Sequence, residues 1–167
     1  TDDSKLMRDN PKKFKIKYIL DNSLNLKITH KEDLEQLNIN FKRTIRVGLG
    51  YDIHRIQKID KFNFIRLGGI KIKSKVSVIS HSDGDVILHA ITDSILGALS
   101  LRDIGTYFPN NKINKNRNSL EFLDYALTKL ENQNFKISNI DLMIVSEVPK
   151  INPYYKRIIN NLIEILN

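Results

Sequence analysis

Residues 81–101 read HSDGDVILHAITDSILGALSL, and this stretch decides the fold because it predicts one long helix with a broad apolar surface. Between Val86 and Leu101, apolar residues cover most of the circumference of such a helix, so we expect it to be largely buried. Ser82 or Asp83 is suited to cap the N-terminus, with an acidic residue following in the first turn. The stretch therefore predicts a capped and buried helix.

A possible metal site involves this helix and an earlier segment. Asp52 and His54 are two residues apart, so in an extended segment their side chains point the same way. His89 would add a third ligand from the helix, which leaves the fourth zinc position for water or a substrate oxygen, as in catalytic sites. The ionisable residues His81 and Asp85 close by favour a site. The alternative is an Asp that caps a turn and ordinary histidines.

His89 has two carboxylates within reach on the same face of the predicted helix. Asp85 lies four residues before it and Asp93 lies four residues after it. Because a metal-binding imidazole usually donates its second N–H to an acceptor, we expect one of these two carboxylates to hold the His89 ring.

The segments before the helix have the pattern of strands. Between Ile45 and Leu49, apolar residues alternate with Arg and Gly, which predicts a half-buried strand that delivers the Asp-x-His pair at its end. Residues 64–72 predict one or two further strands, broken at the pair Gly68-Gly69, where a turn is easy. Residues 55–63 are expected to be a polar connection.

The C-terminal half predicts helix, strand and helix. Leu120 to Leu130 has helical apolar spacing, Ile140 to Val148 resembles a strand, and Tyr154 to Leu166 places its apolar residues on one side of a helix. The predicted fold class is therefore α/β, an α+β sandwich in which helices cover one side of a mixed sheet. Residues 45–167 form the expected domain, and the Lys- and Asn-rich residues 1–44, which lack Gly, look like an appendage.

Composition limits the possible partners and metal ligands. With 27 Lys and Arg against 19 Asp and Glu, the net charge is +8, which favours anionic partners of any kind. The basic residues are spread over the whole chain without a nucleic-acid-binding pattern, so we expect no nucleic acid as partner. No apolar run approaches the roughly 20 residues that span a bilayer, so we expect no membrane contact. The 0 cysteines leave only His and carboxylate ligands for a metal.

Three loops permit two interpretations each. Residues 81–85 form a capped loop or an anion cradle, because backbone N–H groups at a helix N-terminus attract anions. The pair Pro149-Lys150 either only ends a strand, or its Lys150 supplies a positive charge for a phosphate. Residues 101–109 contain a Gly and a Pro that stop a helix, or present Asp103 to a polyol.

Four motifs occur together in this chain: GYDIH at 50–54, HSDGDVILHA at 81–90, DIGTYFP at 103–109 and VPK at 148–150. In this order and spacing they resemble the 2-C-methyl-D-erythritol 2,4-cyclodiphosphate synthase family of the non-mevalonate isoprenoid pathway. The similarity covers residues 45–167. Any one motif is weak evidence, whereas the four together are highly specific.

The resemblance implies roles for particular residues. Asp52, His54 and His89 would bind zinc, and Asp52 and His54 would also bind the substrate. His81, as the catalytic residue, and Ser82 would contact the substrate near the reacting phosphates. Asn110 and Lys112 replace aspartates that the family often has. The methylerythritol part would be held by Asp103, Ile104 and Gly105. The same pocket would be lined by Phe108, Pro109, Asn110, Asn111 and Lys112. Cytidine would be bound by Ser146, Glu147, Val148, Pro149, Lys150, Ile151 and Asn152.

The implied reaction is intramolecular. The 2-phosphate of 4-diphosphocytidyl-2-C-methyl-D-erythritol 2-phosphate would attack the β-phosphorus, release CMP and form the cyclic diphosphate. The implied cofactors are Zn²⁺ at the Asp/His/His site and Mg²⁺ or Mn²⁺ on the diphosphate. The implied assembly is a homotrimer with active sites between subunits. A general zinc-dependent phosphohydrolase and a basic binding module are the competing functions.

The resemblance also predicts features at both ends of the chain. The family continues after the last helix with further strands, so we expect the chain to be C-terminally truncated and inactive or unstable alone. Residues 25–34 are similar to the end of 4-diphosphocytidyl-2-C-methyl-D-erythritol synthase, a cytidylyltransferase that is fused to this family in bifunctional enzymes. A chance leader is the alternative. The expected compartment is the cytoplasm, or a plastid where the source has one.

Overall fold

The computed structural model describes His30, Glu32 and residues 44–166. The chain divides into two compact units, Thr1–Thr44 and Ile45–Asn167. The predictions for the first unit, including the cytidylyltransferase-like segment, lie outside the described residues. All of the secondary structure discussed below belongs to the second unit.

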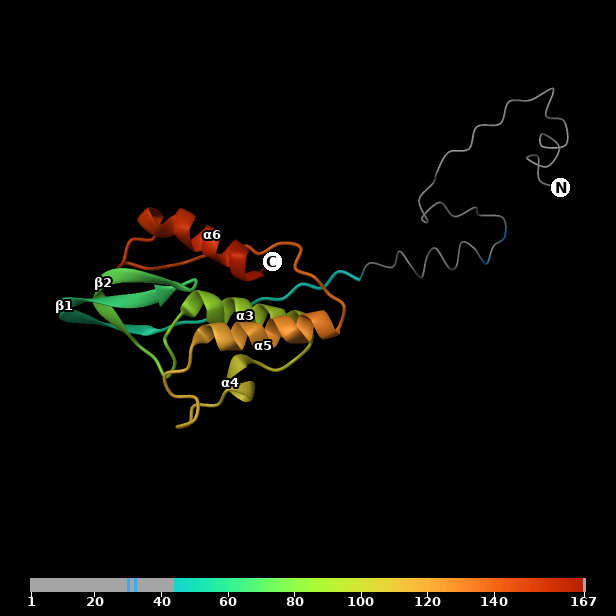
Figure 1. Cartoon of the computed structure of the whole chain (residues 1–167), viewed down its shortest axis with the longest axis horizontal. Helices are drawn as coiled ribbons and strands as arrows, with labels where there is room; N and C mark the ends of the chain where they lie inside the picture. The colour runs from blue at the N-terminus through green and yellow to red at the C-terminus, as the bar shows by residue number, and fades with distance from the viewer. Residues whose placement is uncertain (1–29, 31, 33–43, 167) are drawn as a thin grey trace, which may run out of the picture. The chain divides into compact units, whose positions relative to one another are not determined.

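The second unit is a mixed α/β fold, as expected, with helices packed around a small antiparallel sheet (Figure 1). The buried helix α3 packs against α5, while α6 and the sheet close the remaining sides of the core. The elements in chain order are β1 (Arg55–Leu67), β2 (Ile70–Ile79), α3 (Val86–Ala98), α4 (Ile104–Tyr107), α5 (Ser119–Asn132), a 3-10 turn (Asn152–Tyr154) and α6 (Tyr155–Leu166).

The three predicted long helices are confirmed. Helix α3 spans Val86–Ala98 and buries Leu88, Ile91 and Leu96 almost completely. Helices α5 and α6 match the patterns predicted for residues 120–130 and 154–166. Residues 101–109 were expected to stop a helix or to present Asp103 to a polyol, and they contain the short helix α4, which neither interpretation included.

The sheet is a long hairpin that turns at the predicted glycine pair. Gly68 and Gly69 have φ of 60° and 80°, the left-handed conformation that tight hairpin turns require. Residues 55–63 were expected to be a connection, and this was wrong, because β1 begins at Arg55 and pairs through Lys58 with the end of β2. Backbone hydrogen bonds form this ladder, so its polar, exposed side chains do not prevent it.

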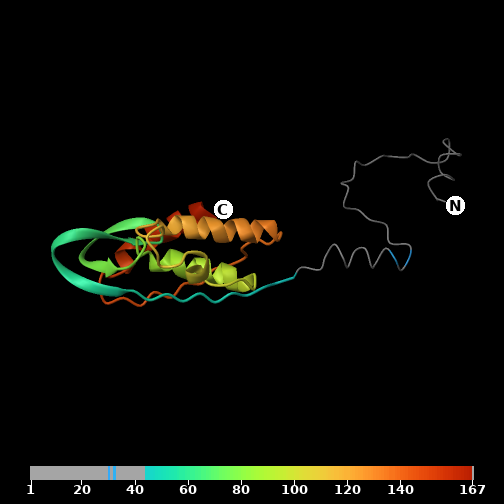
Figure 2. The ribbon, with the colours of Figure 1, turned by 90° about the horizontal axis from the view of Figure 1, so that it is seen from below.

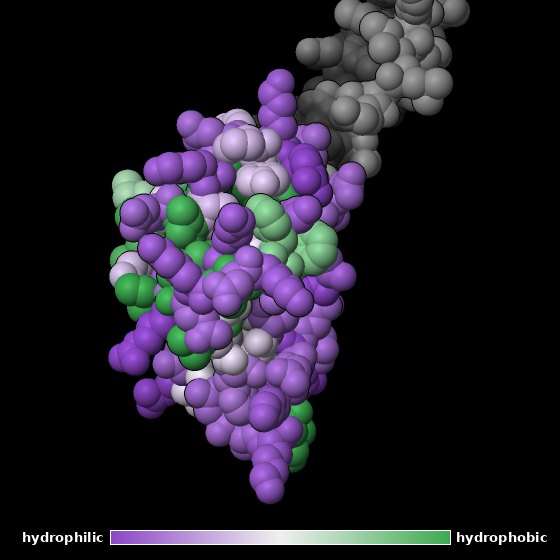
Figure 3. All heavy atoms as spheres, turned by 90° about the vertical axis from the view of Figure 1, so that its left-hand side faces the viewer, coloured by the Kyte–Doolittle hydropathy of each residue, from purple (hydrophilic) through white to green (hydrophobic). Residues whose placement is uncertain are grey.

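The hairpin end of the molecule has a mostly hydrophilic surface with separate apolar spots (Figure 3). Lys73 and Lys75 lie over the ring of Phe62, with their Nζ atoms 4.7 Å and 5.1 Å from its centre. Each contact is a cation–π interaction with a ring that is still 57% exposed.

The carboxylate of Asp85 connects the hairpin turn to helix α3. Its Oδ1 accepts hydrogen bonds from the backbone N–H of Gly68 at 2.8 Å and of Ile87 and Leu88 at 3.2 Å each, and its Oδ2 accepts from Gly69 at 2.7 Å. Burial raises the pKa of Asp85, and the amides of Gly69, Gly68 and Leu88 oppose that shift. The expected cap, Ser82 or Asp83, was therefore wrong by two or three residues.

Two extended segments, residues 44–54 and 140–148, run along the side of α3 that faces away from α5 (Figure 2). Residues 45–49 and 140–148 were predicted as strands, and neither stretch belongs to a ladder in the described part of the chain. The sheet among the described residues is accordingly two-stranded and antiparallel, not the mixed sheet that we expected.

The first extended segment also presents the face opposite to the one expected. Ile45, Val47 and Leu49 are 86%, 88% and 92% exposed, although the alternation predicted that such residues would be buried. Gly48 and Gly50 face α3, where an added Cβ would collide with the carbonyl oxygens of Ser94 and Ala90. Close approach to the helix backbone, which glycine alone permits, therefore decides which face is inside.

We expect a graded loss of stability when Asp85 is replaced. Asp85→Asn keeps one oxygen acceptor but turns an N–H toward Gly69, so the free energy of unfolding should fall by about 1–3 kcal/mol. Asp85→Ala leaves all four amide donors without this acceptor, so the loss should be larger.

Urea unfolding of both variants measures these losses, with Asp124→Asn on the exposed face of α5 as the control. Equal stability of Asp85→Ala and the control would contradict the prediction.

Candidate metal centre

Asp52, His54 and His89 come together at one point, although His54 and His89 are far apart in the sequence. One potential ligand atom from each residue lies within 4.8 Å of the others. The end of the first extended segment carries Asp52 and His54, and helix α3 carries His89. The two nitrogens and one carboxylate oxygen form a donor set that suits zinc and similar divalent metals.

The His54 ring is oriented with a free nitrogen toward this point. Its Nδ1 lies 3.1 Å from the carbonyl oxygen of Ile53, which can only accept, so Nδ1 carries the proton. Nε2 then has a lone pair, lies 3.3 Å from Asp52 Oδ2, and is buried without a hydrogen-bond donor among the described residues. A buried acceptor without a partner fits a metal ligand, because a bound ion would satisfy it.

The His89 ring lies between Asp52 and the start of α5. Its Nδ1 is 2.8 Å from Asp52 Oδ2, and its Nε2 is 2.8 Å from the hydroxyl of Ser119 and 3.2 Å from that of Ser82. The expectation that Asp85 or Asp93 holds this ring was wrong. Asp85 is occupied by four amides, as described above, and Asp93 accepts from the amide of Ile104 at 2.8 Å.

The charges around the metal centre favour an ionised Asp52. Burial raises the pKa of Asp52, but the hydrogen bond from His89 and the charges of His54 and His89 outweigh burial and hold it below its ordinary value. Burial raises the pKa of Asp93, which faces the same region. Asp52 is thus the acidic group that is prepared to bind a cation.

A cavity of about 540 Å³ opens beside the three candidate ligand residues. Phe122 lines it, with its ring centre 5.7 Å from that of His89 and 4.6 Å from that of Phe108. Ten of the residues predicted for the site line this cavity: Asp52, His54, His81, Ser82, His89, Ile104, Gly105, Phe108, Pro109 and Asn110.

The loop before α5 is attached to the loop before α3. His81 Nε2 donates to the carbonyl oxygen of Asn111 at 2.7 Å, and backbone N–H groups of Asn116 and Asp83 bond to the carbonyls of His81 and Arg117. These bonds fix the His81 ring at the wall of the cavity.

Asp103, Asn111 and Lys112 lie outside the cavity wall. Asp103 caps α4, where its Oδ1 accepts from the amide of Thr106 at 2.9 Å and its hydroxyl at 2.7 Å. The amide of Asn111 turns inward to its own loop, accepting from the N–H of Ile113 and Asn114. In this chain Asp103 therefore positions α4, whose residues do reach the cavity.

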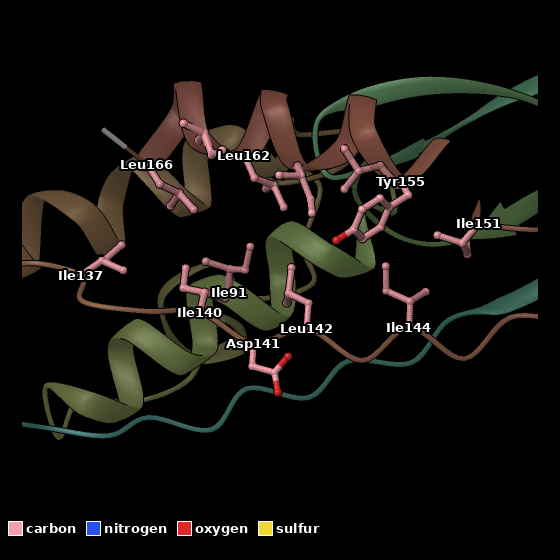
Figure 4. A pocket seen from close by; sticks show the side chains of 13 residues that line it. Ile91, Ile137, Ile140, Asp141, Leu142, Ile144, Ile151, Tyr155, Leu162 and Leu166 are labelled. Atoms are coloured by element: carbon pink, nitrogen blue, oxygen red, sulfur yellow. The ribbon is translucent and has the colours of Figure 1, made fainter. Parts of the chain in front are cut away.

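None of the residues predicted to bind cytidine, 146–152, lines this cavity. Ile151 lines a different, apolar groove of about 530 Å³ between α3, α6 and the second extended segment (Figure 4). Within one chain, the predicted cytidine loop and the metal centre are therefore separate.

The expected anion cradle at the start of α3 is already filled from within the chain. The first free amides of the helix, those of Ile87 and Leu88, bond to the carboxylate of Asp85. The same carboxylate occupies the position that an external anion would take.

Several cavity residues escaped prediction: Ile79, Ser80, Asn114 and Phe122 line it, and Ser119 contacts His89. The pair Asn118-Ser119 before an apolar run indicates a helix start. No spacing in the sequence places that start against His89, which lies 30 residues earlier.

The model of the YgbB family matches residues 45–167. The chain belongs to the YgbB family. Its relatives include the bifunctional enzyme IspD/IspF of Wolbachia pipientis wMel, 42% identical over 99% of this chain and 43% of the relative. Another is the apicoplast 2-C-methyl-D-erythritol 2,4-cyclodiphosphate synthase of Plasmodium falciparum, 42% identical over 84% of this chain and 65% of the relative.

Solved structures of YgbB relatives have the same fold. The CDP complex of IspF from Plasmodium falciparum is 48% identical, with a TM-score of 0.63 over 73% of each chain. The bifunctional IspDF from Campylobacter jejuni is 31% identical, with a TM-score of 0.64 over 99% of this chain and 44% of that one. This YgbB chain thus spans less than half the length of the bifunctional relatives. None of the helices in its described part has the length and apolarity to cross a bilayer.

We expect the pKa of Asp103 to depend on Thr106. The hydroxyl and amide of Thr106 hold the pKa of Asp103 below its ordinary value. Thr106→Val removes the hydroxyl and keeps the shape, so the pKa should rise part of the way back. A carboxyl group whose pKa is lowered by folding stabilises the fold while it is ionised, and this stabilisation is lost as the pH falls through that pKa. With a higher pKa in Thr106→Val, the cap that Asp103 gives α4 should therefore be lost at a higher pH than in the wild type.

NMR titration of the ¹³C-labelled carboxyl of Asp103 measures this change, with Thr128→Val on α5 as the control, since the Thr128 hydroxyl bonds to a backbone carbonyl. An unchanged pKa in Thr106→Val would contradict the expected role of the hydroxyl.

Proposed function

We propose that this protein cyclises 4-diphosphocytidyl-2-C-methyl-D-erythritol 2-phosphate to 2-C-methyl-D-erythritol 2,4-cyclodiphosphate and releases CMP. The observation that carries the proposal is the Asp52, His54 and His89 cluster at a cavity walled by the other family motifs. A relative named for this synthase and a related structure solved with CDP support it. A cavity that combines apolar walls with polar groups beside the cluster suits a phosphorylated polyol.

The three clustered residues would hold Zn²⁺. The lone pair on His54 Nε2, the Nδ1 side of His89 and the ionised carboxylate of Asp52 match the nitrogen and oxygen ligands of catalytic zinc. When bound, the zinc would act as a Lewis acid on a phosphate oxygen, and Mg²⁺ or Mn²⁺ would neutralise the diphosphate.

The protein side chains would mainly position the two phosphates. His81, fixed by its bond to the Asn111 carbonyl, and Ser82 would orient the 2-phosphate for attack on the β-phosphorus. The attacking oxygen forms the new P–O bond as the bond to CMP breaks, and CMP leaves as the anion. Holding the reacting groups together removes roughly 7–11 kcal/mol of barrier in favourable cases, so positioning suffices without covalent catalysis. Ile104, Gly105 and Phe108 would enclose the polyol.

We also propose that the protein works as a homotrimer in which a neighbouring subunit supplies residues 146–152 for cytidine. This would explain why these residues lie away from the metal cavity of their own chain. The outward apolar side chains of the two extended segments, including Val47, Leu49, Met143 and Val145, support burial between subunits, where the segments would join a mixed sheet.

Residues 1–44 are proposed to be the end of a cytidylyltransferase domain. The alignment with the Wolbachia bifunctional enzyme covers 99% of this chain, so it reaches well beyond the 45–167 match.

Substitutions of the proposed metal ligands and of the proposed substrate-contacting histidine should have different effects on zinc content. Asp52→Ala and His89→Ala should lose bound zinc, because each removes one of three protein ligands. His81→Ala should retain zinc and lose turnover, since His81 lines the cavity outside the ligand cluster.

Elemental analysis and CMP release, measured on protein expressed from its natural gene, test both statements. Full zinc content in His89→Ala would refute the ligand assignment. Release of inorganic phosphate in place of CMP would favour a zinc-dependent phosphohydrolase instead.

Self-association should depend on the first extended segment. Leu49→Lys places a charge on the proposed buried surface, so light scattering should report monomers instead of trimers. Ile113→Lys is the control, because Ile113 is 85% exposed in the loop before α5. A trimer that persists in Leu49→Lys would place the subunit contact elsewhere.

A further inference from the structure

The unexpected partner of His89 suggests a function for a serine that no motif contains. Ser119 is the first residue of α5, and the residue is 0% exposed. Serine at a helix start usually caps the helix. Here Asn118 does so, accepting from the amide of Leu120 at 3.1 Å, which leaves the Ser119 hydroxyl for another task.

The Ser119 hydroxyl lies between His89 and a carboxylate. It donates to Asp83 Oδ1, because an ionised carboxylate can only accept. The oxygen of Ser119 then accepts from His89 Nε2 at 2.8 Å. With the proton on Nε2, a neutral ring has its lone pair on Nδ1, and a metal bound there would replace the hydrogen bond that joins Nδ1 to Asp52 Oδ2 at 2.8 Å in this structure.

Asp83 is itself held in place by surrounding elements. Its Oδ2 lies 3.4 Å from Nε of Arg66 at the end of β1. Its backbone N–H donates to the carbonyl of Arg117, and its side chain is mostly buried. The series Arg66, Asp83, Ser119 and His89 thus joins the hairpin, the loop before α3, and the starts of α5 and α3.

We propose that Asp83 and Ser119 form a relay that fixes the orientation and tautomer of His89 and thereby positions its Nδ1 for the metal. Ser119 and Asp83 are positioning residues, since they act on the metal through His89. The arrangement is a carboxylate–histidine–metal pair with a hydroxyl inserted between carboxylate and imidazole. The inference rests on the metal site of the proposed function and extends it by two residues.

The Ser82 hydroxyl is the alternative acceptor, but the geometry favours Ser119. Ser82 Oγ is 3.2 Å from His89 Nε2, and it is shared with the Ser80 hydroxyl and the amide of Gly84. The Ser119 contact is shorter and leads to a carboxylate, so it determines the ring more strongly.

The test measures Zn²⁺ affinity without substrate, by competition with a chromophoric chelator. Ser119→Ala should weaken Zn²⁺ binding about 10- to 100-fold, the range for loss of an outer partner of a metal-bound histidine. Asp83→Asn should weaken it less. The double variant should bind no more weakly than Ser119→Ala, because Asp83 acts through Ser119.

Ser94→Ala is the matched control. Ser94 is a half-buried serine of α3, and its hydroxyl donates to the carbonyl of Ile91 at 2.7 Å, away from the ligands. Its Zn²⁺ affinity should equal that of the wild type. Thermal unfolding of the metal-free variants separates a loss of fold from a loss of affinity.

Imidazole ¹⁵N spectra of the zinc-loaded wild type give a second measurement, the tautomer of His89. A purely structural role of Ser119 and Asp83 would predict no particular tautomer. His89 should carry its proton on Nε2. Metal at Nε2, unchanged affinity in Ser119→Ala, or additive losses in the double variant would each overturn the relay. A wild type that binds no Zn²⁺ would overturn the metal site together with it, whereas a failed CMP assay alone would leave the relay standing.

Discussion

The carboxylate of Asp85 is the constraint on which the rest of the domain depends. Four backbone N–H groups, two from the hairpin turn and two from the first turn of α3, converge on its two oxygens. Because the group is completely buried, water cannot replace any of these bonds. The turn and the helix start are thereby held in one position, and both the loop at residues 81–84 and the ring of His89 take their places from that junction.

The metal centre is assembled from elements that are individually unremarkable in sequence. The first extended segment approaches α3 closely only because Gly48 and Gly50 face the helix backbone. This approach brings Asp52 within 2.8 Å of His89, while the start of α5 brings Ser119 to the opposite side of the same ring. The imidazole is consequently held from both nitrogens, which is the condition for a well-oriented metal ligand.

Much of the fold and the candidate ligand cluster could be predicted. The periodicity of α3, α5 and α6, the turn at Gly68-Gly69 and the shared direction of Asp52 and His54 all follow from local spacing. Three of the errors share one cause. The inward face of residues 45–49, the cap at Asp85 and the partner of His89 each depend on which distant backbone or side chain packs against the residue in question.

The sequence by itself determined the helices, the turn and the residue types able to bind a metal, because propensity and side-chain direction are properties of neighbouring residues. Only the tertiary structure decided that Ser119, 30 residues from His89, holds its ring, while Asp85 and Asp93 on the same helix do not. The physical reason is that each buried polar group must find a partner. Which partner it finds is settled by packing across the whole domain.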